Sequence, residues 1–230
     1  VREVVESIRK SKGSNFLTSL KSIFAVPGHP DVTYEAVARI VSIIYGELPR
    51  DNFFNDQKAF MLNLMNMRTR DKKISEFCLM TCLVHLNKHE DLAAIFLENA
   101  GADMILSILD QNTNEVQLLY YTLLNIWLLS FTEVGVNNFI SVAKLGVIRF
   151  ICEILQKISR EKLVRISFAI FKNIEGNHQC LELMMDNKLL KIVDTLLKGN
   201  IKEEDLVNLI KEIGEILEMN VRVLSSFDKY

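Results

Sequence analysis

A pattern that recurs every 42 to 45 residues constrains the fold of this chain more than any other feature of its sequence. Three apolar segments align with one another, at residues 101–109, 146–154 and 188–196. Each follows a short apolar piece and precedes a polar turn and a longer helix-like segment, at residues 115–131, 161–174 and 203–218. A short, a medium and a long helix at this spacing are typical of armadillo and HEAT repeats.

The segment 162–174 shows the pattern most clearly. At 100° per residue, its apolar side chains cover more than half of a helix circumference, and they are Leu163, Val164, Ile166, Phe168, Ile170, Phe171 and Ile174. One narrow stripe remains, made of Glu161, Lys162, Arg165, Ala169 and Lys172. Such a helix is expected to be buried on several sides and exposed to solvent along one groove.

These observations predict an all-α fold, an armadillo/HEAT-like right-handed superhelix, or α-solenoid. One three-helix unit cannot cover its own apolar faces, so successive units stack and leave their long third helices side by side along a concave groove. Only 3 prolines and 9 glycines interrupt 230 residues, which also favours helix. Earlier, less regular helices are expected at residues 34–45, 54–67 and 74–89.

The expected domain organisation has three parts. Residues 1–32 form an N-terminal segment without a clear pattern, and residues 33–224 form the repeat domain. Residues 225–230 form the third part. Because Val1 is not an initiator methionine, we interpret the chain as part of a longer protein.

Composition argues against several classes of partner. The net charge of −2 and the pI near 6.1 give no general attraction to nucleic acid or to an anionic membrane surface. No run approaches the roughly 18 apolar residues of a membrane span, so no direct membrane insertion is expected. Four cysteines without a disulfide-framework spacing fit a reduced, cytosolic protein.

Motifs for catalysis or cofactor binding are absent from the sequence. It contains no GxxxxGK[ST], GxGxxG, G-x-S-x-G or HExxH. Cys78, Cys82, His85 and His89 share one helical stripe, but they would span roughly 16 Å, which is too far for one tetrahedral zinc ion. A pair such as His85 and His89 could bind metal with outside help, whereas buried cysteines beside a helix-end histidine are the simpler interpretation. We therefore expect no enzyme, no cofactor and no metal site.

The candidate site is a partner-binding surface on the predicted groove. Its basic part is Lys162, Arg165 and Lys172, which could contact phosphate or an acidic partner, or could be a solvated face partly neutralised by Glu161. The positions 45 residues before 162, 165, 169 and 172 correspond to the same stripe in the preceding repeat. They are Gln117, Tyr120, Leu124 and Trp127. Tyr120 and Trp127 could anchor a peptide, or belong to the core of a helix that is hydrophobic all round.

Asn173 completes the candidate site. Armadillo repeats commonly carry an asparagine near this point of the third helix, where it serves structure or holds peptide backbone. A transport adaptor that grips peptide signals would show a ladder of asparagine and tryptophan in successive third helices. Here Trp127 and Asn173 occur in different copies, and Leu128 takes the asparagine position of the preceding copy. An adaptor that binds peptide or protein partners in its groove stays the alternative interpretation.

Several ordered segments closely resemble the H subunit of the vacuolar-type proton-pumping ATPase. They are residues 117–120, 126–131, 160–166, 169–173, 204–206 and 224–230. The resemblance extends from about residue 34 to residue 230, and Val1 to Pro30 match no motif of the family.

The resemblance implies a non-catalytic regulatory subunit on the cytosolic side of the pump, at the vacuole or another acidic organelle. In that family the N-terminal domain is a helical-repeat superhelix. It contacts the peripheral stalk subunits E and G and supports coupled ATP hydrolysis and proton transport. Residues 225–230 resemble the start of the linker that leads from this domain to a smaller C-terminal domain, which would lie outside this chain. The absence of a phosphate-binding loop agrees with such a role.

Overall fold

The computed structural model describes most of the chain from Glu90 onward. The described residues are 19–20, 22–23, 26, 28–30, 32–33, 36–37, 40, 90–111, 115–158, 160–199 and 201–227. The helices expected at 54–67 and 74–89, most of the one at 34–45, and the Cys78 to His89 stripe lie outside them.

The chain divides into two compact units, Val1–Ala102 and Asp103–Tyr230. In the first unit, α6 (Glu90–Glu98) buries Leu92, Ala93 and Phe96. The boundary falls near the start of α7 (Gly101–Gln111). The second unit contains the candidate site.

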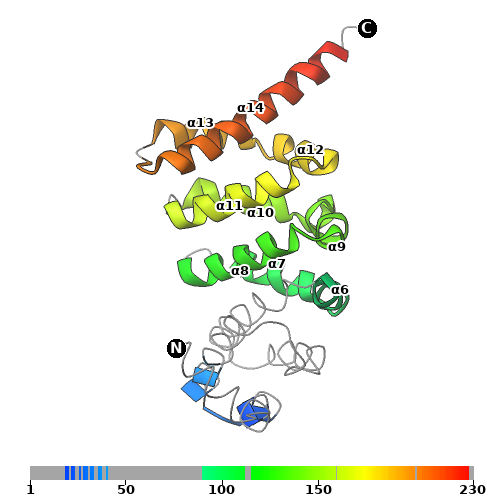
Figure 1. Cartoon of the computed structure of the whole chain (residues 1–230), viewed down its shortest axis with the longest axis vertical. Helices are drawn as coiled ribbons and strands as arrows, with labels where there is room; N and C mark the ends of the chain where they lie inside the picture. The colour runs from blue at the N-terminus through cyan, green and yellow to red at the C-terminus, as the bar shows by residue number, and fades with distance from the viewer. Residues whose placement is uncertain are drawn as a thin grey trace, which may run out of the picture. The chain divides into compact units, whose positions relative to one another are not determined.

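The second unit is built only from helices among its described residues (Figure 1). After α7 come α8 (Val116–Leu129), α9 (Glu133–Gly135), the π-helical turn η3 (Val136–Ile140), the 3-10 turn η4 (Ala143–Leu145), α10 (Val147–Lys157), α11 (Glu161–Ile174), α12 (His178–Asp186), α13 (Leu189–Lys198) and α14 (Glu204–Phe227). Short, medium and long helices follow one another as the sequence predicts. The all-α solenoid is confirmed, while the right-handed superhelix stays a prediction.

The long helices α8, α11 and α14 lie side by side, with α11 contacting both of the others (Figure 1). Apolar side chains fill the space between them. On α11, Phe168 and Phe171 are fully buried and pack edge to face, with ring centroids 5.7 Å apart. On α14, buried Leu206, Ile210, Ile213 and Leu217 recur at helical spacing. Gly214 lets α14 approach α13 closely, because a Cβ there would lie 3.0 Å from a methyl carbon of Val193.

The residue before each medium helix has a left-handed backbone conformation. The φ angles are 66° at Ala100, 69° at Gly146 and 58° at Lys188, immediately before α7, α10 and α13. The sequence alignment paired Gly101 with Gly146, whereas the structure pairs Ala100 with Gly146. The alignment was therefore wrong by one residue in that copy, because a glycine was matched by identity and not by backbone conformation.

The observed bounds of α11 match the predicted ones, whereas α14 is longer than predicted. Observed α11 runs from Glu161 to Ile174, as predicted. Helix α14 continues to Phe227, well beyond the predicted end at residue 218. No break in this helix marks residue 225, where a linker was expected, and the proposed domain boundaries stay a prediction.

Within the described part of the chain, no single helix is long and apolar enough to cross a membrane. Two bent pairs of helical segments meet that test, by length and composition only, when the two members of a pair are taken together. The first pair is α6 and α7, and the second is α8 and the segment made of α9 and η3.

Candidate functional site

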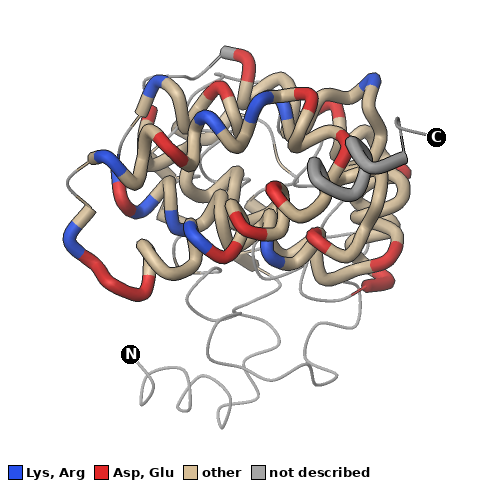
Figure 2. The backbone as a smooth tube through the Cα atoms, turned by 90° about the horizontal axis from the view of Figure 1, so that it is seen from above, with Lys and Arg blue, Asp and Glu red and all other residues tan. Residues whose placement is uncertain are grey.

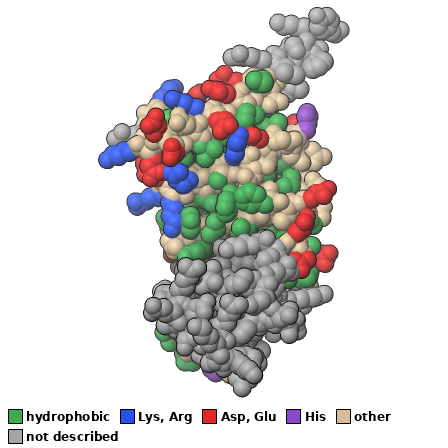
Figure 3. Space-filling model, viewed as in Figure 1, with side chains coloured by type: hydrophobic (Ala, Val, Ile, Leu, Met, Phe, Trp, Pro, Cys, Tyr) green, Lys and Arg blue, Asp and Glu red, His purple; other side chains and the backbone are tan. Residues whose placement is uncertain are grey.

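All six predicted site residues lie on two neighbouring helices. Tyr120 and Trp127 belong to α8, and Lys162, Arg165, Lys172 and Asn173 belong to α11. We call the exposed side of α8, α11 and α14 the third-helix face. In the space-filling view, Lys and Arg side chains gather mainly toward one edge, and apolar side chains occupy much of the centre (Figure 3).

Lys162 and Tyr120 are brought together by the packing of α11 on α8. The Lys162 ammonium lies 3.7 Å from the centroid of the Tyr120 ring. A cation over an aromatic face is attracted by about 0.5–1 kcal/mol at an exposed site. The sequence predicted that both residues lie on the groove, and the structure shows that their side chains contact each other.

Arg165 is paired within the chain. Its guanidinium forms an ion pair with Glu203, just before α14, and both side chains are about half exposed. Beside it, the backbone N–H of Lys202 donates a hydrogen bond to the Glu161 carboxylate at 3.4 Å. These contacts join the start of α11 to the segment that leads into α14. An exposed ion pair stabilises a fold by only about 0–1 kcal/mol.

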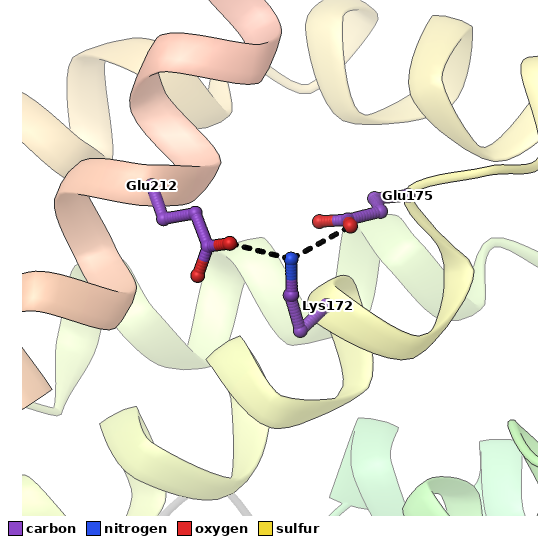
Figure 4. Close-up of polar contacts among 3 residues, drawn as sticks. All are labelled: Lys172, Glu175 and Glu212. Carbon is purple, nitrogen blue, oxygen red and sulfur yellow. Dashed lines mark hydrogen bonds and ion pairs between the residues drawn. The ribbon is translucent and has the colours of Figure 1, made fainter.

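Lys172 has two carboxylate partners (Figure 4). Its Nζ lies 2.7 Å from Glu175 Oε1 at the end of α11 and 2.6 Å from Glu212 Oε1 on α14. Hydrogen bonds to Glu175 and then to Glu212 raise the pKa of Lys172 above its ordinary value, since both favour the charged amine. The other Glu175 oxygen, Oε2, is buried and has no hydrogen-bond partner among the described residues.

Asn173 joins α11 to the end of α8. Its side-chain amide donates a 2.8 Å hydrogen bond to Ser130 Oγ, and the Ser130 hydroxyl donates to the Trp127 carbonyl at 2.6 Å. The Asn173 amide is therefore engaged in a contact between repeats, which argues against the peptide-backbone role considered for an adaptor.

Trp127 is partly exposed and has an aromatic partner that sequence reasoning missed. The rings of Trp127 and Phe131 pack edge to face with centroids 4.9 Å apart, and Phe131 is 62% exposed. The spacing of four residues places both side chains on one side of a helix, and this was the available signal. The pair is an apolar feature to which a partner protein could bind.

Glu203, Glu212 and Ser130 were also missed as neighbours of the predicted residues. Their partners lie about one repeat away in sequence, 40 residues for Lys172 with Glu212 and 43 for Asn173 with Ser130. A search for opposite charges or hydrogen-bonding pairs at that spacing would have suggested them. The face thus contains contacts between consecutive repeats, and no catalytic arrangement is evident in them.

Two cysteines of the described part are unsuited to nucleophilic chemistry. Burial raises the pKa of Cys152 to about 12 and that of Cys180 to about 11. Both are therefore protonated near neutral pH, and a thiol is a much weaker nucleophile than a thiolate. Among the residues described here, no three potential metal ligands lie together.

Two engineered proteins with crystal structures share this fold. Their TM-scores are 0.73 and 0.72, and each match covers 95% of this chain, with 86% and 85% of the engineered chain. Sequence identity is only 11% and 9%, so the similarity is one of fold alone.

Curated relatives share a larger fraction of identical residues with this chain than the two engineered proteins do. The chain is 29% identical over 153 residues to a probable H subunit of the V-type proton ATPase from Oryza sativa, a match that covers 66% of this chain and 33% of the relative. It is 26% identical over 182 residues to the H subunit of the V-type proton ATPase from Dictyostelium discoideum, with 76% and 40% covered. The chain thus spans about a third of the length of such relatives.

A family model for the H subunit of the V-ATPase matches residues 7–217. This match includes α8, α11 and the first part of α14, and it extends into the N-terminal segment for which the sequence offered no motif. The chain belongs to the V-ATPase H-subunit family.

Proposed function

We propose that this chain is a non-catalytic regulatory part of a vacuolar-type proton-transporting ATPase. It contacts peripheral stalk subunits E and G, supports coupled ATP hydrolysis and proton transport, and lies on the cytosolic face of vacuolar or other acidic-organelle membranes. The observation that supports this proposal is the family match over residues 7–217. ATP binding by the isolated chain, measured by calorimetry, would contradict the non-catalytic role.

The third-helix face is the proposed contact with the stalk. Trp127 and Phe131 offer a partly exposed aromatic pair, and large aromatic residues are enriched among those that dominate binding energy. The cations contribute less to binding the stalk, because carboxylates of the chain already pair with two of them. Acidic groups of the stalk must compete with Glu203 for Arg165 and with Glu212 for Lys172. The aromatic pair therefore supplies most of the affinity, and Lys162 with the paired cations sets orientation and association rate.

The test measures binding of the full chain to an immobilised E–G heterodimer. Trp127→Ala combined with Phe131→Ala should weaken binding about thirtyfold, since truncating an interface aromatic can cost about 2 kcal/mol or more. Leu197→Ala is the control, because it removes an exposed apolar side chain on α13, outside the third-helix face. Arg165→Glu with Lys172→Glu should weaken binding in a salt-dependent manner.

Melting temperatures of all variants must be compared, because charge reversal places carboxylates opposite Glu203 and Glu212. If the aromatic and charge variants both bind like the parent chain, the third-helix face is not the interface. If the parent chain itself does not bind the heterodimer, the proposed stalk contact is wrong.

A further inference from the structure

Two cavities lie along α10, on surfaces that include no residue of α8, α11 or α14. One, of about 330 Å³, is lined at the start of α10 by residues that include Lys144, Ile148, Arg149 and Leu183. The other, of about 280 Å³, is lined at the end of α10 by residues that include Leu155, Lys188 and Lys191. We call the two together the α10 furrow.

The turn between α12 and α13 separates the two cavities. Asn187 lines the first cavity, and the next residue, Lys188, lines the second. Ile148 and Gln156 are eight positions apart on α10, which corresponds to roughly 12 Å along the helix axis. The furrow is therefore two openings spaced along one helix and flanked by the following repeat.

The three lysines of the furrow differ from Arg165 and Lys172 on the third-helix face, which are paired with carboxylates. Lys144, Lys188 and Lys191 form no ion pair with any described residue. Arg149 approaches Glu153 only at 3.9 Å, and Lys157 approaches the same carboxylate at the same distance. Seen from above, the basic positions are spread over several helical segments and are not confined to one (Figure 2).

None of the described residues that line either cavity is acidic. Asp186 and Asp194 are exposed on α12 and α13 but do not line the cavities. Cations that have no internal partner keep more of their capacity to pair with another molecule. On this ground the furrow is better suited to an acidic ligand than Arg165 and Lys172 are.

Beneath the basic rim the cavities have an apolar floor. Ile148 is buried under the first, and Leu155, Ile192 and Leu196 are buried under the second. Discrete apolar openings rimmed by cations favour a protein segment over a nucleic acid, because a phosphate backbone has no apolar side chains to insert. The net charge of −2 also gives the chain no general attraction to nucleic acid or to an anionic bilayer.

We propose that the α10 furrow binds an acidic segment of a partner protein. Two apolar side chains of the segment, roughly 12 Å apart, enter the two cavities. Its carboxylates pair with Lys144 and Arg149 at the first opening and with Lys188 and Lys191 at the second. The surface is separate from the third-helix face, so this proposal does not depend on the stalk contact.

The test selects binders from a library of random linear peptides displayed on phage, with the full 230-residue chain as bait. Enriched peptides should share carboxylates and two apolar residues. Lys188→Glu combined with Lys191→Glu should weaken the binding of synthetic copies roughly tenfold or more, with strong dependence on salt. Arg165→Glu with Lys172→Glu is the matched control, since it reverses the same number of charges on the other face and should change binding less than about twofold.

A second variant tests the cavity without changing charge. Thr195 is exposed, lines the second cavity and makes a hydrogen bond only within its own helix, so Thr195→Trp fills the opening and should also abolish peptide binding. Circular dichroism melting checks the folding of each variant. The proposal is overturned if no peptide is enriched, if enriched peptides lack carboxylates, or if they bind both charge variants equally. Binding of phosphatidylserine vesicles through Lys188 and Lys191, with no peptide selected, would identify a membrane surface instead.

Discussion

At the scale of single residues, the polar positions of α11 form contacts between repeats. Lys162 lies against Tyr120 and Asn173 against Ser130, both toward α8, while Arg165 and Lys172 pair toward α14. One polar stripe therefore contacts both neighbouring third helices. Its exposure made it a candidate partner site, and the same exposure keeps each of its ion pairs weak.

The Asn173 hydrogen bond should contribute measurably to stability. Asn173→Ala removes the donor to Ser130 Oγ in a partly buried position, and the free energy of unfolding should fall by about 1 kcal/mol. Asn208→Ala is the matched control, because Asn208 is an exposed helical asparagine on α14 and the gain in helix propensity is the same. Urea unfolding measures the difference between the two variants, and equal midpoints would show that the bond contributes nothing.

At the scale of elements, the entry into each medium helix has a defined backbone conformation. Ala100, Gly146 and Lys188 have left-handed torsions although only one of them is glycine. For the other two residues this conformation costs roughly 1–2 kcal/mol, and the surrounding repeat maintains it. Conformation is therefore repeated more faithfully than residue type at this position.

Gly146→Ala should destabilise the chain by about 1 kcal/mol, because the left-handed backbone strains any residue with a Cβ. Gly176→Ala is the control, since Gly176 follows α11, lacks a positive φ and has no atom within 4 Å of an added Cβ. That change should be neutral or slightly stabilising, because alanine reduces the entropy of the unfolded chain. Urea midpoints that fall equally for both variants would contradict the conformational argument.

At the scale of the molecule, each repeat of the second unit completes the core of the one before it. Helix α14 contacts both α11 and α13, and it buries Leu206, Ile210, Ile213 and Leu217. Each fully buried aliphatic side chain contributes about 1.5–3 kcal/mol of transfer free energy. Four of them together are comparable with the whole stability of a typical domain, about 5–15 kcal/mol.

Ending the chain after Gly199 should therefore expose apolar surface and lower the urea midpoint sharply. The shortened chain should also bind the dye ANS, which reports exposed hydrophobic surface. Ending the chain after Asn220 is the control, because all four buried residues of α14 remain. An unchanged midpoint for the shorter chain would mean that the second unit is stable without α14.

The sequence by itself determined the helical repeat and the family. Amphipathic periodicity is a local property of 3.6 residues per turn, so the apolar pattern of residues 162–174 was sufficient to predict α11 from Glu161 to Ile174. It also placed Lys162 and Tyr120 on the same face. The family resemblance rested on several ordered motifs, and the match over residues 7–217 confirms it.

Only the tertiary structure decided which cations are already paired. In the sequence, Arg165, Lys172, Lys188 and Lys191 are all basic residues of helix-like segments. In the structure, Glu203 and Glu212 pair with the first two, and no described carboxylate forms an ion pair with the others. Ion pairing between helices depends on their rotation and relative shift, and a change of one residue in register turns a side chain by about 100°. Local periodicity identifies the face of each helix, whereas its neighbours are fixed by the packing of one repeat on the next.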